Sequence, residues 1–276
     1  MPTETTEPQA GTRTINVRGQ RLRVFIRPGN GTRTPLLLMN GVGVNLEVLQ
    51  PFVDALDPAY EVIRFDVPGT GGSPAPRVPY RFWMHAWLVA EMLDQLGYRQ
   101  VDVLGVSWGG ALAQQFAFQY PRRCRRLILV STGTGALMVP GRPSALARLA
   151  TPRRYQDPSH MERIAGETFG GKVRTNPEYA RAFARSIRLG GQRGYFYQML
   201  GGVGWTSLPW LCLLRQPTLI LHGDDDPIVP LINAHILHRL IPNSRLYIFH
   251  DGHLGLGTSA REITPVIEQF LTTSTA

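Results

Sequence analysis

One serine of this sequence lies in a setting that suits a nucleophile. Ser107 is the centre of residues 105–109, which read Gly-Val-Ser-Trp-Gly. An apolar, β-branched run at residues 101–104 predicts a buried strand, and residues 111–118 predict a helix. The serine is therefore expected on a sharp turn from strand to helix, where glycines leave room for the crossing backbone segments. An ordinary glycine–serine turn is the alternative, but the flanking strand and helix favour a catalytic serine.

A serine nucleophile needs a histidine base, and that base needs an acid to orient it. A strand predicted at residues 217–221 leads into three adjacent aspartates, Asp224, Asp225 and Asp226. Asp226 is the predicted acid, because residues 223–230 have the form Gly-x-x-Asp-x-x-x-Pro, which places this carboxylate just before the turn into a helix. The other two aspartates are interpreted as turn-forming or helix-capping residues.

The base is expected after the last predicted strand, where His250 and His253 compete. His250 still follows the alternation of the strand and is interpreted as a structural residue at the strand end. Gly252 lets the loop turn back over the serine, which favours His253 as the base. The spacing of the other histidines is not that of metal ligands, and neither a metal nor a cofactor is expected.

The oxyanion that forms when serine attacks an ester needs two backbone N–H donors. The first is assigned to Trp108, the residue after the serine, and the second to Val42, in the loop that follows a predicted buried strand. Gly41 and Gly43 could instead form an ordinary flexible turn. The position of the loop directly after a buried strand favours the functional interpretation.

The order of the predicted elements indicates the fold that must position these residues. Strands alternate with helices along most of the chain, which predicts an α/β protein with a mostly parallel sheet and helices on both faces. Together with the serine turn and the order serine, aspartate, histidine, this predicts the α/β-hydrolase fold. Its core is expected from residues 12–133 and 215–276, with an inserted helical cap at 134–214 and a disordered lead at 1–11.

The composition excludes several classes of protein. Hydrophobic residues make up 43% of the chain and charged residues 18%, which suits a globular protein with a sizeable core. No apolar run approaches the roughly 18 residues that cross a bilayer. The polar start lacks a secretory signal, so a cytoplasmic location is expected. The net charge of +9 is spread through the chain without a nucleic-acid motif, so nucleic-acid binding is not expected.

Several segments outside the serine motif are similar to those of one enzyme family. They are residues 41–47, 65–69, 79–82, 105–116, 152–155, 204–207, 215–219 and 223–227. With them, the sequence resembles intracellular poly(3-hydroxyalkanoate) depolymerases of the medium-chain-length type, over residues 14 to 271. The resemblance implies a serine esterase that cleaves a stored polyester and associates with polymer granules. It also implies that Ser107, His253 and Asp226 form the catalytic triad.

Two alternative functions stay open. The first is a small-molecule carboxylesterase, lactonase or carbon–carbon bond hydrolase of the same fold, because a triad alone does not separate these activities. The second is a non-catalytic binding protein, which the full set of site residues disfavours. In the cap, Tyr195, Trp205 and Trp210 are candidate substrate-binding residues, although packing against the core is the default role of such aromatics.

Overall fold

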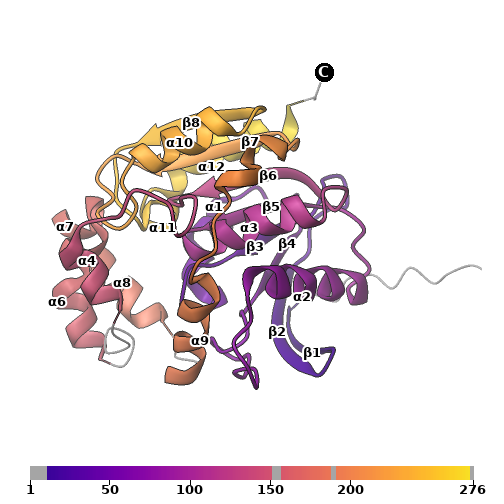
Figure 1. Cartoon of the computed structure of the whole chain (residues 1–276), viewed down its shortest axis with the longest axis horizontal. Helices are drawn as coiled ribbons and strands as arrows, with labels where there is room; N and C mark the ends of the chain where they lie inside the picture. Colours follow the sequence, from indigo (N-terminus) through magenta and orange to yellow (C-terminus); the bar gives the residue numbers. More distant parts are fainter. Residues whose placement is uncertain (1–10, 151–156, 188–190, 274–276) are drawn as a thin grey trace, which may run out of the picture.

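A twisted sheet forms the centre of the molecule (Figure 1). The computed structural model describes residues 11–150, 157–187 and 191–273, and within them eight strands form one sheet in the order β1-β2-β4-β3-β5-β6-β7-β8. The strands are β1 (Gly11–Val17), β2 (Gln20–Arg27), β3 (Leu36–Met39), β4 (Val62–Phe65), β5 (Val101–Val106), β6 (Cys124–Val130), β7 (Thr218–Gly223) and β8 (Ser244–Phe249). Strands β3 to β8 are parallel, whereas β1 and β2 pair in the antiparallel sense at one edge. The predicted α/β class is confirmed.

Helices cover both faces of this sheet (Figure 1). The first face carries α2 (Phe82–Gln95), α3 (Trp108–Gln119) and α10 (Ile232–Leu240), and the second carries α1 (Gln50–Ala55) and α12 (Ala260–Thr272). Successive residues of β3 serve the two faces in turn, because side chains alternate along a strand. Leu37 and Met39 pack with the first set of helices, and Leu36 and Leu38 with the second.

One expected helix is divided in two. The sequence predicts a single helix over residues 46–56, but the structure has a 3-10 helix η1 (Leu46–Leu49) followed by α1. Pro51 lies at the start of α1 and has no N–H with which to continue the hydrogen bonding of a preceding turn. The proline therefore begins a new helix instead of extending the old one.

The helical insertion lies between β6 and β7. Its described elements are α4 (Pro143–Leu149), α6 (Pro158–Phe169), α7 (Gly171–Thr175), α8 (Pro177–Ser186), α9 (Gln192–Gly202) and the 3-10 helix η2 (Leu208–Leu213). Figure 1 shows α4, α6, α7 and α8 gathered at one side of the sheet. An isolated bridge between Gly135 and Thr206 joins the two ends of the insertion. All these elements fall within the predicted cap, although residues 152–155 lie outside the described part.

The sequence explains where two cap helices begin. Asp157 precedes α6 and its side chain accepts the N–H of His160, while Asn176 precedes α8 and accepts the N–H of Glu178. These side chains satisfy N–H groups that have no partner within the first turn of a helix. Both helices also start with proline, whose fixed φ suits the first helical position.

The predicted lead lies outside the described residues, except for Gly11, which begins β1. Over the described ranges, none of the helices is long and apolar enough to cross a membrane.

Two phenylalanines of α3 give a test of the core. Phe116 is fully buried, whereas Phe118 is 38% exposed and stacks on Trp210. We expect Phe116→Ala to lower the free energy of unfolding by about 3–5 kcal/mol, because it leaves a cavity in the core. Phe118→Ala should cost about 1 kcal/mol or less, since it removes mainly one aromatic contact. Urea denaturation of both variants measures the difference, and equal losses would contradict this packing.

Candidate active site

Ser107 lies on a strained turn between β5 and α3. Its backbone has φ 54° and ψ −118°, a conformation that side chains rarely adopt, and its N–H donates to the Val130 carbonyl at 2.9 Å. The flanking glycines are required by close contacts. A Cβ at Gly105 would lie 2.3 Å from the Gly109 carbonyl oxygen, and one at Gly109 would lie 2.1 Å from the Met39 carbonyl oxygen. Strand and helix therefore approach each other closely enough to hold the serine on the turn.

His253 and Asp226 form a buried hydrogen-bonded pair. His253 Nδ1 lies 2.7 Å from Asp226 Oδ2, and the side chains are 7% and 0% exposed. Asp226 Oδ1 accepts the N–H groups of Ile228 and Val229, each at 2.9 Å, which fixes the carboxylate. The backbone N–H of His253 donates to the Phe169 carbonyl at 2.8 Å. The Asp226 carboxylate can only accept a hydrogen bond, so Nδ1 of His253 carries the proton. The imidazole therefore presents Nε2 as its basic atom.

The competing side chains have other partners. Asp224 accepts a hydrogen bond from His250, whose side chain is 96% exposed. Asp225 forms an ion pair with Arg174 at 2.8 Å and accepts the Gly171 N–H at the same distance. Asp226 is therefore the aspartate of the three that contacts His253, as the sequence pattern favours.

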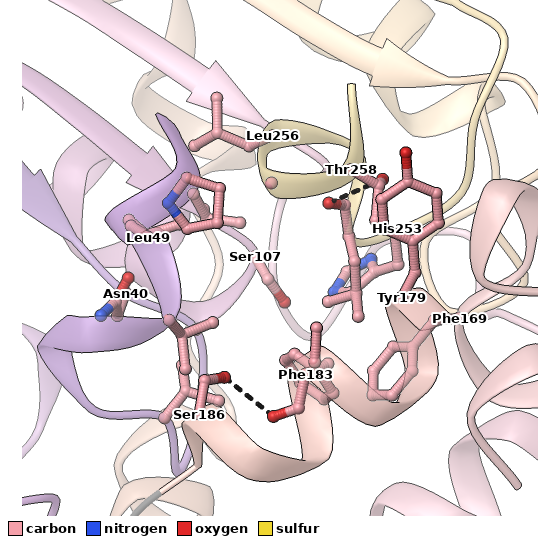
Figure 2. Close-up of a pocket in the computed structure, with 18 of the residues that line it drawn as sticks. Asn40, Leu49, Ser107, Phe169, Tyr179, Phe183, Ser186, His253, Leu256 and Thr258 are labelled. Carbon is pink, nitrogen blue, oxygen red and sulfur yellow. Dashed lines mark hydrogen bonds between the residues drawn. The ribbon is translucent and has the colours of Figure 1, made fainter. Parts of the chain in front are cut away.

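Ser107 and His253 line the same cavity, which has a volume of about 440 Å³. Figure 2 shows Ser107 near its centre, with His253 on one side and residues of α8, among them Phe183 and Ser186, forming another wall. Most of the lining side chains are apolar. They include Val42, Val44, Val48, Leu49, Val106, Leu149, Phe169, Ala182, Phe183, Ile228, Leu254 and Leu256. The cavity can therefore accept an apolar group beside the serine.

The loop after β3 also reaches this cavity, through Asn40, Gly41 and Val42. A hydrogen bond from Asn40 Nδ2 to the Asn45 carbonyl, at 2.8 Å, closes the base of the loop. The Gly43 N–H is occupied, because it donates to the side chain of Gln198 in α9 at 2.7 Å. The loop thus lies where the sequence predicts, but its contact with the cap was not anticipated.

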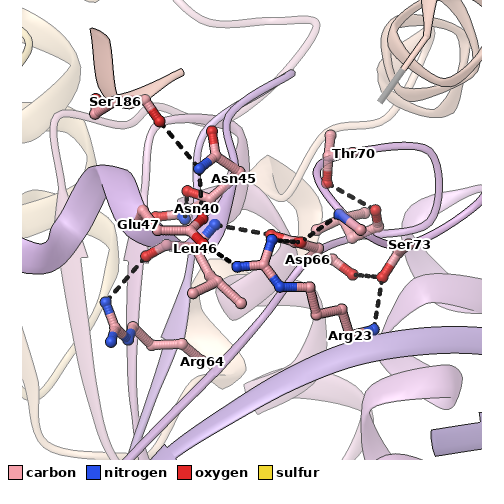
Figure 3. A network of polar contacts seen from close by, with 12 residues as sticks. Arg23, Asn40, Asn45, Leu46, Glu47, Arg64, Asp66, Thr70, Ser73 and Ser186 are labelled. Atoms are coloured by element: carbon pink, nitrogen blue, oxygen red, sulfur yellow. Dashed lines mark hydrogen bonds and ion pairs between the residues drawn. The ribbon is translucent and has the colours of Figure 1, made fainter. Parts of the chain in front are cut away.

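A buried polar network joins the same loop to residues of β2 and of the segment after β4 (Figure 3). Asp66 Oδ1 accepts the Leu46 N–H at 2.8 Å, and Oδ2 accepts the Gly72 N–H at 2.7 Å. Arg23 forms ion pairs with both Asp66 and Glu47. Burial raises the pKa of Asp66, and its hydrogen bonds and the nearby guanidinium oppose that shift. The loop is therefore fixed to the strands beneath it by groups that satisfy one another.

Two buried histidines close to the site remain neutral. Burial lowers the pKa of His222, whose Nε2 lies 2.7 Å from the Val229 carbonyl and 3.7 Å from Asp226 Oδ2. Burial also lowers the pKa of His85 to about 3, and its ring packs edge-on against Trp108 at 5.2 Å. Neither histidine therefore brings a positive charge to the site at neutral pH. In the part of the chain that the structure describes, no three His, Cys, Asp or Glu residues are grouped to hold a metal ion.

Comparison with known proteins identifies the family. The model of the α/β-hydrolase fold family matches residues 34–259 of this chain. The chain belongs to the α/β-hydrolase family. A poly(3-hydroxyalkanoate) depolymerase of Ectopseudomonas oleovorans is 54% identical to this hydrolase over 259 residues, which cover 94% of this chain and 92% of the relative. The predicted resemblance and the prediction of an ester hydrolase are thereby confirmed.

More distant relatives share the fold of this hydrolase. A 2-hydroxymuconate semialdehyde hydrolase of Pseudomonas putida is 30% identical, over 76% of each chain. The crystal structure of an enol-lactonase from Burkholderia xenovorans superposes with a TM-score of 0.81 at 21% identity, over 95% of this chain and 100% of the other.

The aromatic candidates for substrate binding belong to two hydrophobic clusters of the hydrolase. Tyr195 is buried in the cluster at the centre of the cap, and Trp205 and Trp210 pack against the core on the first face of the sheet. None of the three is among the described residues that line the cavity, so the cavity gives no support to that prediction. The aromatic residues that do line it are Phe169, Tyr179 and Phe183.

The aspartates allow a matched test of this site. We expect Asp226→Asn to lower turnover of a soluble ester by roughly 10³- to 10⁴-fold, because the imidazole loses its orienting anion. Asp224→Asn and Asp225→Asn should change turnover little, since their contacts are with His250 and Arg174. The same comparison applies to His253→Ala and His250→Ala. Steady-state kinetics of the folded variants measure the effect, and an inactive Asp225→Asn would refute the assignment.

Proposed function

We propose that this hydrolase cleaves the ester bonds of a poly(3-hydroxyalkanoate) through a triad of Ser107, His253 and Asp226. The observation that carries the proposal is that a strained serine and a buried histidine–aspartate pair meet at one apolar cavity. The 54% identity to a poly(3-hydroxyalkanoate) depolymerase supports the choice of substrate. A polyester with alkyl side chains fits a wall on which most side chains are apolar.

The proposed reaction proceeds in two steps. His253 Nε2 takes the proton of the Ser107 hydroxyl while Oγ attacks the ester carbonyl, and Asp226 stabilises the imidazolium. The N–H groups of Val42 and Trp108 bind the oxyanion. His253 then gives its proton to the departing alkoxide, which leaves an acyl-enzyme. Water repeats the sequence, with His253 again as the base, and releases the 3-hydroxy acid or oligomer.

The cavity is compatible with the acyl part of such a substrate. Its volume of about 440 Å³ lies within the roughly 300–1,000 Å³ of common small-molecule sites. Polar side chains are the minority on its wall, and Glu47 among them is already paired with Arg23. An alkyl chain of medium length would therefore meet mostly apolar surface. A small soluble ester or an enol-lactone would also fit this cavity. Assays on polymer and on soluble esters distinguish these substrates.

The serine provides the first test of the proposed function. We expect Ser107→Ala to lower turnover by roughly 10⁴- to 10⁶-fold with the fold intact, because no nucleophile remains on the turn. Release of 3-hydroxy acids from a medium-chain polyester suspension, and hydrolysis of a short soluble ester, measure both activities.

The outcomes separate the alternatives. Near-normal activity of Ser107→Ala would refute the triad. Activity of the unmodified protein on soluble esters alone would indicate a small-molecule esterase or lactonase. A binding protein would leave Ser107 unlabelled by a serine-directed phosphonate.

A second part of the proposal is that the cap contacts a polymer granule. Exposed apolar side chains gather on α9 and its C-terminal end, where Phe196, Met199 and Val203 are 58%, 40% and 60% exposed. Several cap arginines are already paired, such as Arg148 with Glu167 and Arg181 with Glu162. Apolar contact with the polymer is therefore the stronger basis for association than charge.

The exposed face of α9 can be tested with Phe196→Ala. Burying roughly 50 Å² of this ring against polymer would contribute about 1.2 kcal/mol, or roughly an eightfold change in activity on particles. Activity on a soluble ester should stay unchanged, because Phe196 does not line the cavity among the described residues. Trp83→Ala is the control, since Trp83 is similarly exposed, at 57%, on α2 outside the cap. Equal losses on particles and soluble ester would refute docking through α9.

A further inference from the structure

We propose that Gln198, on helix α9 of the cap, is a positioning residue for the oxyanion hole. The inference rests on the proposed function, because it assigns a task within the same serine site. Gln198 lies far from Ser107 in the sequence and carries no recognisable motif. It is 2% exposed, and both its side chain and its main chain contact the elements that carry the two oxyanion donors.

The contacts of Gln198 converge from two directions. Its side-chain oxygen accepts the Gly43 N–H at 2.7 Å, one residue after the proposed donor Val42. Its main-chain carbonyl accepts the indole N–H of Trp108 at 3.1 Å, and the backbone N–H of Trp108 is the other proposed donor. One residue of the cap therefore holds both sides of the oxyanion hole.

The link matters because a glycine gives the backbone of the loop extra conformational freedom at this point. Gly43 has φ +72° and no side chain, so local packing alone does not fix its peptide plane. The Gly43 N–H belongs to the planar peptide that also carries the Val42 carbonyl, so this contact fixes one of the two peptides that flank Val42. In a buried site a hydrogen bond acts more strongly than in water. Small displacements of such donors lower turnover by large factors, because stabilisation of the oxyanion depends on geometry.

Helix α9 is itself held firmly against the core. Arg193, near its start, donates to the carbonyls of Pro76 and Arg77, and Arg81 donates to the carbonyls of Leu200 and Val203 at its end. These contacts hold both ends of the helix to residues 76–81.

Glycines allow the helix to approach closely between those ends. A Cβ at Gly194 would lie 2.0 Å from the Gly69 carbonyl oxygen, and one at Gly201 would lie 2.4 Å from that of Tyr80. Gln198 lies between these two contacts, so its amide is presented to the loop from a fixed base.

The test compares Gln198→Met with Gln192→Met. Methionine has a similar length but only a weakly accepting sulfur, so the Gly43 N–H loses its strong partner. We expect kcat on a short soluble ester to fall by roughly 10- to 100-fold with KM changed less than about threefold, because only the transition state carries the oxyanion. Gln192→Met, the same substitution at an exposed position of the same helix, should leave kcat within about twofold.

The affinity of an inhibitor gives a second measurement, which substitution of a purely structural residue would not change selectively. A trifluoromethyl ketone adds to Ser107 and forms a hemiketal oxyanion, so its affinity should fall by the same factor as kcat. The affinity of the matching methylene analogue, which has no carbonyl, should stay unchanged. Parallel loss for both compounds would place Gln198 in substrate binding and overturn the proposal.

The remaining outcomes also decide the matter. If Gln198→Met does not fold, Gln198→Asn takes its place, because its shorter amide withdraws from Gly43 while staying polar. Unchanged kcat in either folded variant, or failure of both to fold, would overturn the positioning role. Failure of the proposed function appears separately, as an unmodified protein whose Ser107 is not labelled by a phosphonate. The soluble ester makes the result independent of polymer.

Discussion

The close approach of β5, α3 and β3 around Ser107 is the constraint on which the rest of the site depends. The backbone of Ser107 is held at φ 54° because the chain must reverse from strand to helix within one residue. Gly105 and Gly109 permit this, since a Cβ at either would meet a carbonyl oxygen at under 2.5 Å. The Thr132 hydroxyl, at the end of β6, also donates to the Ser107 carbonyl at 2.8 Å. Strain at the serine is therefore maintained by the packing of the whole central sheet.

Around this rigid turn, the other groups of the site come from separate segments, each fixed by its own contacts. Asp226 is held by two N–H groups of the turn that follows it, and it orients His253 in turn. The loop after β3 is held on the side of the core by the Asp66 network and on the side of the cap by Gln198. His222 and His85 are neutral, so they add no positive charge beside these groups. The arrangement keeps each reacting group in place before substrate arrives, which is how protein dipoles stabilise a transition state efficiently.

The sequence was sufficient for the parts of the site that local patterns determine. The glycines around Ser107 and the spacing around Asp226 each reflect a backbone requirement within a few residues, and Gly252 marks the turn that brings His253 to the site. The Gln198 contact joins residues 155 positions apart, so no local pattern announces it. The assignment of Trp205 and Trp210 met the opposite difficulty. Packing against the core is the default role of aromatic residues at such spacing, and the structure shows both tryptophans partly buried against the core.

The division between core and cap has a consequence for specificity. Ser107, His253 and Asp226 come from the core, whereas α8 and Phe169 of the cap supply much of the cavity wall. Substitutions in the cap can therefore reshape the cavity wall without moving Ser107, His253 or Asp226. The proteins similar to this chain include a depolymerase, a semialdehyde hydrolase and an enol-lactonase, which differ in what their names say they act on. Helix α9 limits this freedom, because Gln198 contacts both Gly43 of the loop after β3 and the indole of Trp108. In the proposed mechanism a change at Gln198 alters turnover itself, whereas a change at the α8 residues that line the cavity alters the space beside Ser107.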